Sequence, residues 1–213
     1  MADETNVRPL AVSQGDALII VDVQRDFLAG GALAVPKGDE VIGTLNRYLD
    51  LFSARGLPIF ATRDWHPPNH CSFVAQGGPW PPHCIMHTAG AEFPPELRFP
   101  RSVKLVSKAT GPQREALSPF SDTNLDEQLR SLGIRRLFVG GLATDYCVAA
   151  TVRDALTRSY AVVLLTDAIR AVDVRPQDGR RAQDEMLGLG AVPARWEDLS
   201  LADRATSPPE VLE

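Results

Sequence analysis

The chain has 213 residues, of which 44% are hydrophobic, and its formal net charge is −5 at pH 7. This length suits one domain with a full core, and the mildly acidic balance argues against nucleic acid or a membrane surface as the partner. No apolar run in the sequence approaches the ~20 residues that span a bilayer. We predict one domain at 15–203, with an N-terminal tail at 1–14 and a C-terminal tail at 204–213.

The N-terminus is polar and lacks the apolar core of a signal peptide, so the sequence predicts a cytoplasmic protein. The three cysteines, Cys71, Cys84 and Cys147, are too few and too scattered for a disulfide framework. A reduced compartment would therefore leave a free thiol available for chemistry.

Short apolar runs alternate with helical patterns along the chain. Continuous apolar runs predict buried strands, and apolar residues that recur every three or four positions predict helices. In chain order we expect a strand at 17–21, a helix at 38–55, strands at 57–61 and 102–106, a helix at 122–132, a strand at 136–139, a helix at 145–158, a strand at 160–165, a helix at 178–189 and a short strand at 191–192. This alternation predicts an α/β fold with a mostly parallel sheet that helices cover on both faces.

Chemically capable residues follow the first four predicted strands. They are, in chain order, Asp22, Asp64, Lys108 and Cys147. Sites in open parallel sheets lie beyond the carboxyl ends of the strands, so we expect these residues at one edge. The long, proline-rich segment 64–100 belongs to the same edge, and a loop of that length in a compact domain is usually functional or disordered.

Cys147 follows a strand that ends in Gly140 and Gly141, where a helix is predicted to begin. A thiol in the first turn of a helix experiences the positive end of the helix dipole, which favours the thiolate. The two glycines allow a sharp turn that can aim several N–H groups at a bound oxygen. Cys147 is therefore a candidate nucleophile, and a buried structural cysteine is the alternative.

Asp22 and Lys108 are candidates to assist that thiol. Desolvation at the end of a buried strand raises the pKa of a carboxyl group, which suits Asp22 as the base that takes the thiol proton. Asp26 is the competing carboxylate, further along the chain. Lys108 would stabilise the anions of both Asp22 and Cys147. Spacing alone, however, favours a solvated lysine at the end of a strand. The alternative role for Asp22 is a structural one, in which it caps a neighbouring loop.

All four histidines fall within the long segment. Asp64 and His66 form a D-x-H pair that can converge on one metal ion, and His83 can return from the loop to complete the set. One aspartate and two histidines leave open coordination positions, as catalytic or substrate-binding metal sites require. His70 is a further candidate ligand or supporting partner, and His87 is a weaker one.

Eight short motifs occur in order along the chain: DVQRDF, GGALAV, TRDWHPPNH, WPPHC, GAEF, SKATG, SPF and GLATDYCV. Together they resemble the nicotinamidase branch of the isochorismatase-like cysteine hydrolase family. The resemblance implies a three-layer αβα sandwich with a mostly parallel six-stranded sheet. It also implies an amidohydrolase of NAD salvage that converts nicotinamide to nicotinate and ammonia through a thioester, with pyrazinamide-like analogues as further substrates.

The resemblance also assigns roles to single residues. Three of them match the family's catalytic triad, namely Asp22, Lys108 and Cys147. Three match the ligands of one divalent metal, commonly zinc and sometimes iron or manganese, namely Asp64, His66 and His83. The Leu142–Ala143 bond matches a cis peptide of the family, and an oxyanion hole would use the backbone N–H groups of Ala143 and Cys147. Four further residues match the family positions that surround the substrate ring, namely Phe27, Leu33, Trp80 and Tyr146.

Other functions are weighed against this one. A related amidase or carbamoyl hydrolase could use the same triad on another small amide, although many of those relatives lack the D-x-H pair with a second histidine. A non-catalytic interaction domain is disfavoured because all three triad residues are present. A redox or metal sensor built on Cys71 and Cys84 lacks paired cysteine spacing. The sequence leaves a homo-oligomer open, and it departs from the common family pattern at Met86, His87, Ala89 and Ala109.

Overall fold

The computed structural model describes residues 10–199 of the chain. The predicted C-terminal tail, the last residues of the predicted domain and most of the predicted N-terminal tail lie outside the described residues. Within the described part of that N-terminal tail, Leu10 forms an isolated bridge with Leu199, and Val12 is buried in the core.

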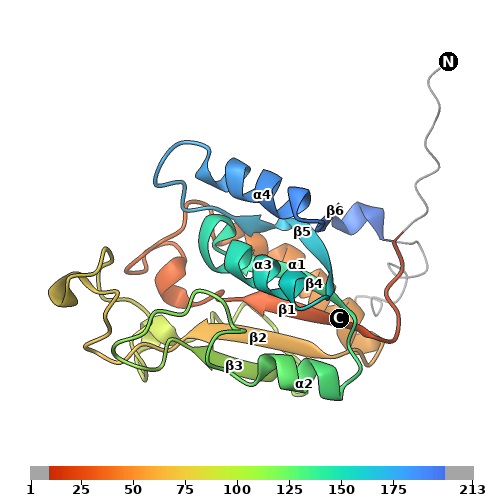
Figure 1. The fold of residues 1–213 in the computed structure, drawn as a ribbon, viewed down its shortest axis with the longest axis horizontal. Helices are drawn as coiled ribbons and strands as arrows, with labels where there is room; N and C mark the ends of the chain where they lie inside the picture. Colours follow the sequence, from red (N-terminus) through yellow and green to blue (C-terminus); the bar gives the residue numbers. More distant parts are fainter. Residues whose placement is uncertain (1–9, 200–213) are drawn as a thin grey trace, which may run out of the picture.

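The described chain forms a six-stranded sheet with the strand order β3-β2-β1-β4-β5-β6 (Figure 1). The five pairings between neighbouring strands are all parallel. The strands are β1 (Asp16–Val21), β2 (Ile59–Asp64), β3 (Lys104–Lys108), β4 (Arg136–Leu142), β5 (Ala161–Arg170) and β6 (Val192–Ala194). The predicted α/β fold is therefore confirmed.

Helices cover both faces of the sheet, which explains why β1 is buried throughout and apolar from Ala17 to Val21. Alternate residues of β1 point to opposite sides. Leu18 and Ile20 share a core with α1, whereas Ile19 shares a second core with α2, α3 and α4. The helices are α1 (Glu40–Ala54), α2 (Leu125–Ser131), α3 (Ala149–Thr157) and α4 (Asp178–Gly188). Short turns complete the described chain: 3₁₀ turns at Arg25–Phe27, Val74–Gln76, Ala89–Ala91 and Trp196–Asp198, and a π turn, η4, at Thr144–Val148.

Strand β3 lies two residues later than the predicted strand at 102–106. Its register pairs Phe60 with Lys104 and Asp64 with Lys108. Because β3 is an edge strand that pairs only with β2, it tolerates polar residues that an apolar-run criterion excludes. The shift makes Lys108 the last residue of the strand, directly beside Asp64.

Strand β4 runs three residues beyond the predicted end at Val139 and includes both glycines. Gly141 has a φ of 124° and pairs with Val21. A Cβ atom at Gly141 would fall 2.1 Å from the carbonyl oxygen of Val21, so only glycine fits there. This close approach places the end of β4 against the end of β1.

The strand arrows in Figure 1 point toward the side of the molecule that carries the long segment 65–103. This segment is fully described, and it contains two 3₁₀ turns but no α-helix or named strand. Among residues 10–199, no helix combines the length and apolar character that a bilayer span requires.

Candidate active site

Three residues that the sequence predicts to act together lie in contact at the carboxyl ends of the strands. Asp22 follows β1, Lys108 ends β3, and Cys147 lies in η4 after β4. The ammonium nitrogen of Lys108 is 3.0 Å from Oδ2 of Asp22 and 3.4 Å from Sγ of Cys147. One buried cation thus joins a carboxylate and a thiol.

Lys108 is buried and has two further partners. Its ammonium group donates hydrogen bonds to the carboxylate of Asp64 and, at 3.1 Å, to the carbonyl oxygen of Ala116. Burial by itself lowers the pKa of Lys108, but the carboxylates of Asp22 and Asp64 outweigh this and raise it well above its usual value. The solvated lysine that spacing alone favours is therefore wrong, because β3 delivers the side chain into the protein.

Asp22 is fully buried, and its two oxygens have different surroundings. The hydroxyl of Thr62 donates a 2.6 Å hydrogen bond to Oδ1. Oδ2 forms the 3.0 Å ion pair with Lys108 and has no other polar partner among the described residues. Burial raises the pKa of Asp22 above its usual value despite the nearby ammonium. Such a carboxylate has both the basicity and the free lone pair of a proton acceptor.

Cys147 lies in a π turn and not in the first turn of an α-helix. The N–H of Val148 donates to the carbonyl oxygen of Ala143, five residues earlier, so the predicted α-helix at 145–158 opens with a π turn and α3 starts at Ala149. Burial raises the pKa of the Cys147 thiol well above its usual value, and the Lys108 ammonium does not offset this. The helix terminus therefore does not supply a resting thiolate, because removal from water dominates.

The backbone before Cys147 carries the cis peptide bond implied by the family resemblance, between Leu142 and Ala143. Ala143 and Cys147 both line the pocket above the thiol. The oxyanion hole that uses their backbone N–H groups stays a prediction.

Asp64, His66 and His83 form a compact buried group. Each offers one ligand atom, and these atoms lie within 4.8 Å of one another. Nδ1 of His66 lies 3.0 Å from the carbonyl oxygen of His83, and Nδ1 of His83 lies 2.8 Å from that of Pro81. Because a carbonyl oxygen accepts a hydrogen bond, Nδ1 of each ring carries the proton and donates it in that bond, which leaves Nε2 of both rings free as an acceptor.

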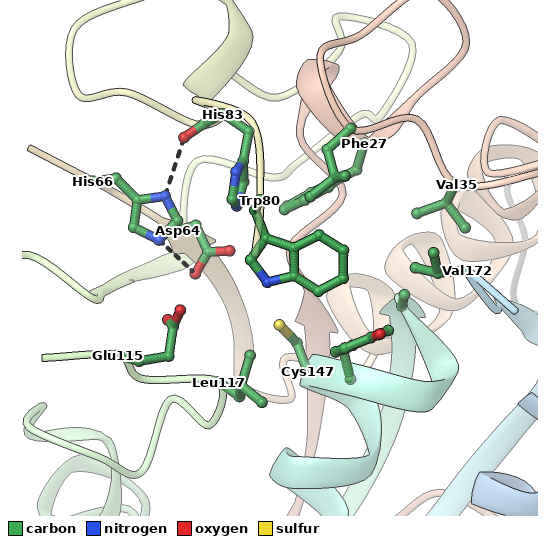
Figure 2. Close-up of a pocket in the computed structure, with 13 residues that line it drawn as sticks. Phe27, Val35, Asp64, His66, Trp80, His83, Glu115, Leu117, Cys147 and Val172 are labelled. Carbon is green, nitrogen blue, oxygen red and sulfur yellow. Dashed lines mark hydrogen bonds and ion pairs between the residues drawn. The ribbon is translucent and has the colours of Figure 1, made fainter. Parts of the chain in front are cut away.

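This group fits a divalent cation. Nε2 of His66 is buried without a hydrogen-bond partner, 3.9 Å from Oδ1 of Asp64 (Figure 2). Burial lowers the pKa of His66 to about 4, so the ring is neutral at physiological pH, as a metal ligand must be. A buried polar atom left unpaired is costly unless something completes its bonding, and a metal ion would do so.

His70 and His87 do not join this group. The ring of His70 stacks on that of His66, with centroids 4.3 Å apart. Its nitrogens, however, bond to the hydroxyl of Ser72 at 2.7 Å and to the carbonyl oxygen of Arg114 at 3.1 Å. His70 therefore packs against the ring of His66 and uses its own nitrogens in hydrogen bonds. Its ring also lies near Glu115, with which it and His66 form a second group of potential ligands. His87 is exposed.

A pocket that is partly open to solvent lies over the thiol. Figure 2 shows Cys147 between the Asp64–His66–His83 group on one side and Val35 and Val172 on the other. All four predicted wall residues line it: Phe27, Leu33, Trp80 and Tyr146. The sequence reasoning missed three apolar lining residues, Val35, Leu117 and Val172, because no motif separates an apolar wall residue from an ordinary core residue. It also missed Glu115, an exposed charged residue that lies between two of the motifs.

Asp26, the competing carboxylate, serves the backbone instead. Its Oδ2 accepts a hydrogen bond from the N–H of Cys84 at 2.7 Å, and its Oδ1 accepts one from that of Ala32 at 3.3 Å.

The unusual residues Met86, His87 and Ala89 are not among the residues that line the pocket over the thiol. Ala109 has a φ of 52°, a left-handed backbone conformation that favours glycine.

Comparisons with known proteins agree with this geometry. The nicotinamidase of Escherichia coli is 41% identical over 206 residues, covering 85% of this chain and 97% of that protein. A solved structure of the pyrazinamidase of Pyrococcus horikoshii in complex with zinc superposes with a TM-score of 0.82 at 47% identity, covering 85% of this chain and 99% of that chain. The PnC1 of L. infantum, solved in complex with nicotinate, has a TM-score of 0.81 at 36% identity, covering 90% of this chain and 98% of that chain.

The isochorismatase domain family matches residues 16–198, a range that includes the whole sheet and all the residues of the candidate site. The E. coli relative exceeds 30% identity over nearly its full length. On both grounds the chain belongs to the isochorismatase family.

Proposed function

We propose that this chain is a nicotinamidase, an amidohydrolase that converts nicotinamide to nicotinate and ammonia. The observation that carries the proposal is the Lys108 ammonium, which contacts the Asp22 carboxylate and the Cys147 thiol beside a buried group of potential metal ligands. The E. coli nicotinamidase and the L. infantum structure with nicotinate support the choice of substrate. The reaction belongs to NAD salvage, and pyrazinamide-like analogues are further expected substrates.

The first step makes a nucleophile from a neutral thiol. Cys147 passes its proton to Asp22, whose Oδ2 has no partner other than the Lys108 ammonium. The negative charge then moves from the carboxylate to the sulfur, and both groups lie beside Lys108. Because the ammonium faces the charge before and after the transfer, it reduces the cost of forming a thiolate in a buried site.

The thiolate attacks the carboxamide carbon and forms a C–S bond, while the carbonyl π electrons move onto oxygen. The backbone N–H groups of Ala143 and Cys147 are the proposed donors to this oxyanion. One such donor contributes ~3–4 kcal/mol in a comparable site. When the tetrahedral adduct collapses, the C–N bond breaks and the nitrogen takes the proton from Asp22, so ammonia leaves and a thioester remains.

Hydrolysis of the thioester completes the reaction. Asp22, again a carboxylate, takes a proton from an incoming water, and the hydroxide attacks the acyl carbon. The same N–H groups hold the second oxyanion. Collapse breaks the C–S bond, returns the proton from Asp22 to sulfur and releases nicotinic acid, which loses its carboxyl proton to solvent and becomes nicotinate.

We propose that Asp64, His66 and His83 hold one divalent metal ion, with zinc as the expected identity. The zinc in the P. horikoshii structure supports this, as does the unpaired Nε2 of His66. When bound, the metal supplies an electron-pair acceptor for the pyridine nitrogen of the substrate. Phe27, Leu33, Trp80 and Tyr146 are the proposed walls for the ring, and they keep the carboxamide near Cys147.

We further propose a cytoplasmic location. Cys71, Cys84 and Cys147 are all free thiols, and the mechanism needs Cys147 reduced. A reducing compartment maintains that state.

Ammonia release from nicotinamide by the purified, zinc-loaded protein tests the proposal. We expect release by the parent, loss of about 10³-fold or more in Cys147→Ala, and severe loss on chelation that added zinc restores. Cys71→Ala is the matched control, because it removes a thiol that the mechanism does not use, and it should keep parental activity.

Benzamide, which lacks the ring nitrogen, is the informative second substrate. We expect a large loss of kcat/KM for benzamide relative to nicotinamide. A loaded protein that releases no ammonia from nicotinamide but hydrolyses another amide or a ureido acid would favour the carbamoyl hydrolase alternative. Parental activity in Cys147→Ala would overturn the mechanism.

A further inference from the structure

Gln24 lies two residues beyond the proposed base, and it is fully buried. Its side-chain amide bonds to both backbone groups of one residue. Nε2 donates to the carbonyl oxygen of Asp64 at 2.8 Å, and Oε1 accepts the N–H of Asp64 at 2.8 Å. Nε2 also donates to the carbonyl oxygen of Ala91 at 2.9 Å. These three bonds engage both amide protons and the amide oxygen.

The position of Gln24 explains why Asp64 needs such a partner. Strand β1 ends at Val21, and its last pairing with β2 joins Ile20 to Ala61. Beyond that point, Asp22 donates its N–H to the carbonyl oxygen of Thr62, and the chain then turns away. The backbone groups of Asp64 on this side have no strand beside them, and the amide of Gln24 takes the place of the missing strand.

The third hydrogen bond, to the carbonyl oxygen of Ala91, links Gln24 to the long segment 65–103 as well. Ala91 belongs to the long segment that also carries His66 and His83. By bonding to Ala91 and Asp64 together, Gln24 joins this segment to the end of β2. The side-chain amide is fully engaged in bonds to the backbone, so any effect on the metal must act through the backbone.

We propose that Gln24 is a positioning residue for the metal site, in that it holds the Asp64 carboxylate where the two histidines can share an ion with it. The inference rests on the metal set of the proposed function. Outer partners that orient metal ligands typically contribute a 10–100-fold change in metal affinity. Loss of Gln24 should therefore weaken metal binding more than it weakens folding.

The test is the zinc affinity of the folded apo protein, measured by competition with a chromogenic chelator in the absence of substrate. Gln24→Met keeps the volume and removes all three hydrogen bonds. Gln24→Glu keeps an acceptor for the N–H of Asp64 and removes the donors, so it serves if the first variant does not fold. We expect 10–100-fold weaker zinc binding in either variant, with kcat recovering toward the parent at saturating zinc.

Asn46→Leu is the matched control. Asn46 is also a buried amide that bonds the backbone twice, donating to the carbonyl oxygen of Glu96 at 2.8 Å and accepting the N–H of Arg98 at 2.9 Å. It is not among the residues that line the pocket over the thiol. Its loss should lower the melting temperature but change zinc affinity by less than about threefold.

Equal zinc affinity in the parent and in a folded Gln24 variant would overturn the inference and leave the proposed function intact. An equal loss of affinity in Asn46→Leu would also overturn it, since general loosening would then suffice. If the parent itself binds no divalent metal, the metal part of the proposed function fails first, and this inference falls with it.

Discussion

At the scale of single residues, two buried carboxylates share one ammonium group and respond in opposite directions. Burial raises the pKa of both, but Asp64 is brought below its usual value by Lys108 and by the neighbouring histidines, whereas Asp22 stays above. Pairs of titratable groups whose environments push their pKa values apart mark acid–base sites. The split suits Asp64 as a permanent anion and Asp22 as the group that exchanges protons.

Thr62→Val tests this assignment. The variant removes the hydrogen bond to Oδ1, which lowers the pKa of Asp22 in the parent, so that pKa should rise further. The base must be deprotonated, so activity falls as pH drops through its pKa. The acid limb of kcat/KM should therefore move to higher pH, by on the order of one unit. Thr62→Ser retains the hydroxyl and should leave the limb in place. Identical pH–rate profiles for Thr62→Val and the parent would argue against Asp22 as the base.

At the scale of elements, the π turn η4 is tied to the segment that follows β5. The carboxylate of Asp145 accepts the N–H of Val172 at one oxygen and that of Asp173 at the other, both at 2.9 Å. Val172 lines the pocket, and Asp145 precedes Tyr146 and Cys147 in the turn. One carboxylate thus sets the separation between the nucleophile and the opposite pocket wall.

Asp145→Ala should release that wall. Both hydrogen bonds are lost, so we expect KM for nicotinamide to rise by about tenfold with a smaller fall in kcat, and the free energy of unfolding to fall by about 1–3 kcal/mol. Asp145→Asn keeps one acceptor, so its KM and its free energy of unfolding should lie between those of Asp145→Ala and those of the parent. Michaelis parameters and denaturant unfolding measure both effects. A fall in kcat at unchanged KM would instead place Asp145 in the chemistry.

At the scale of the whole molecule, the site joins a rigid sheet to a long irregular segment. Asp64 belongs to β2, whereas His66 and His83 come from the segment 65–103, which has little regular structure of its own. A metal bound by all three would therefore fasten the segment to the sheet. A ligand that binds only the folded state at 100 times its Kd adds about 2.7 kcal/mol to stability.

Removal of metal should loosen that segment before the sheet. In limited proteolysis, we expect the chelated protein to be cut first within 65–103, and zinc to protect it, because cleavage follows local opening. The melting temperature should rise with zinc concentration. His83→Ala should abolish both effects of zinc, while His87→Ala, which alters an exposed histidine of the same segment, should preserve them. Equal cleavage with and without zinc would contradict a fastening role.

The sequence by itself determined the order of strands and helices along the chain. It also determined which residues gather at the carboxyl ends of the strands. Both follow from local rules, since apolar periodicity records which faces are buried, and parallel strands bring their carboxyl ends together. Asp22, Asp64 and Cys147 were predictable in this way from their places after apolar runs. The D-x-H pair and the clustering of the histidines added His66 and His83, and the family resemblance added the cis bond before Ala143.

Only the tertiary structure decided how those residues behave. The burial of Lys108 between two carboxylates depends on the register of β3, an edge strand whose polar residues concealed it. The raised pKa of the Cys147 thiol depends on atoms packed around it from distant segments. The amide of Gln24 bonds to a residue forty positions away. Contacts of this range leave no local pattern in a single sequence, because they arise only when the chain has folded.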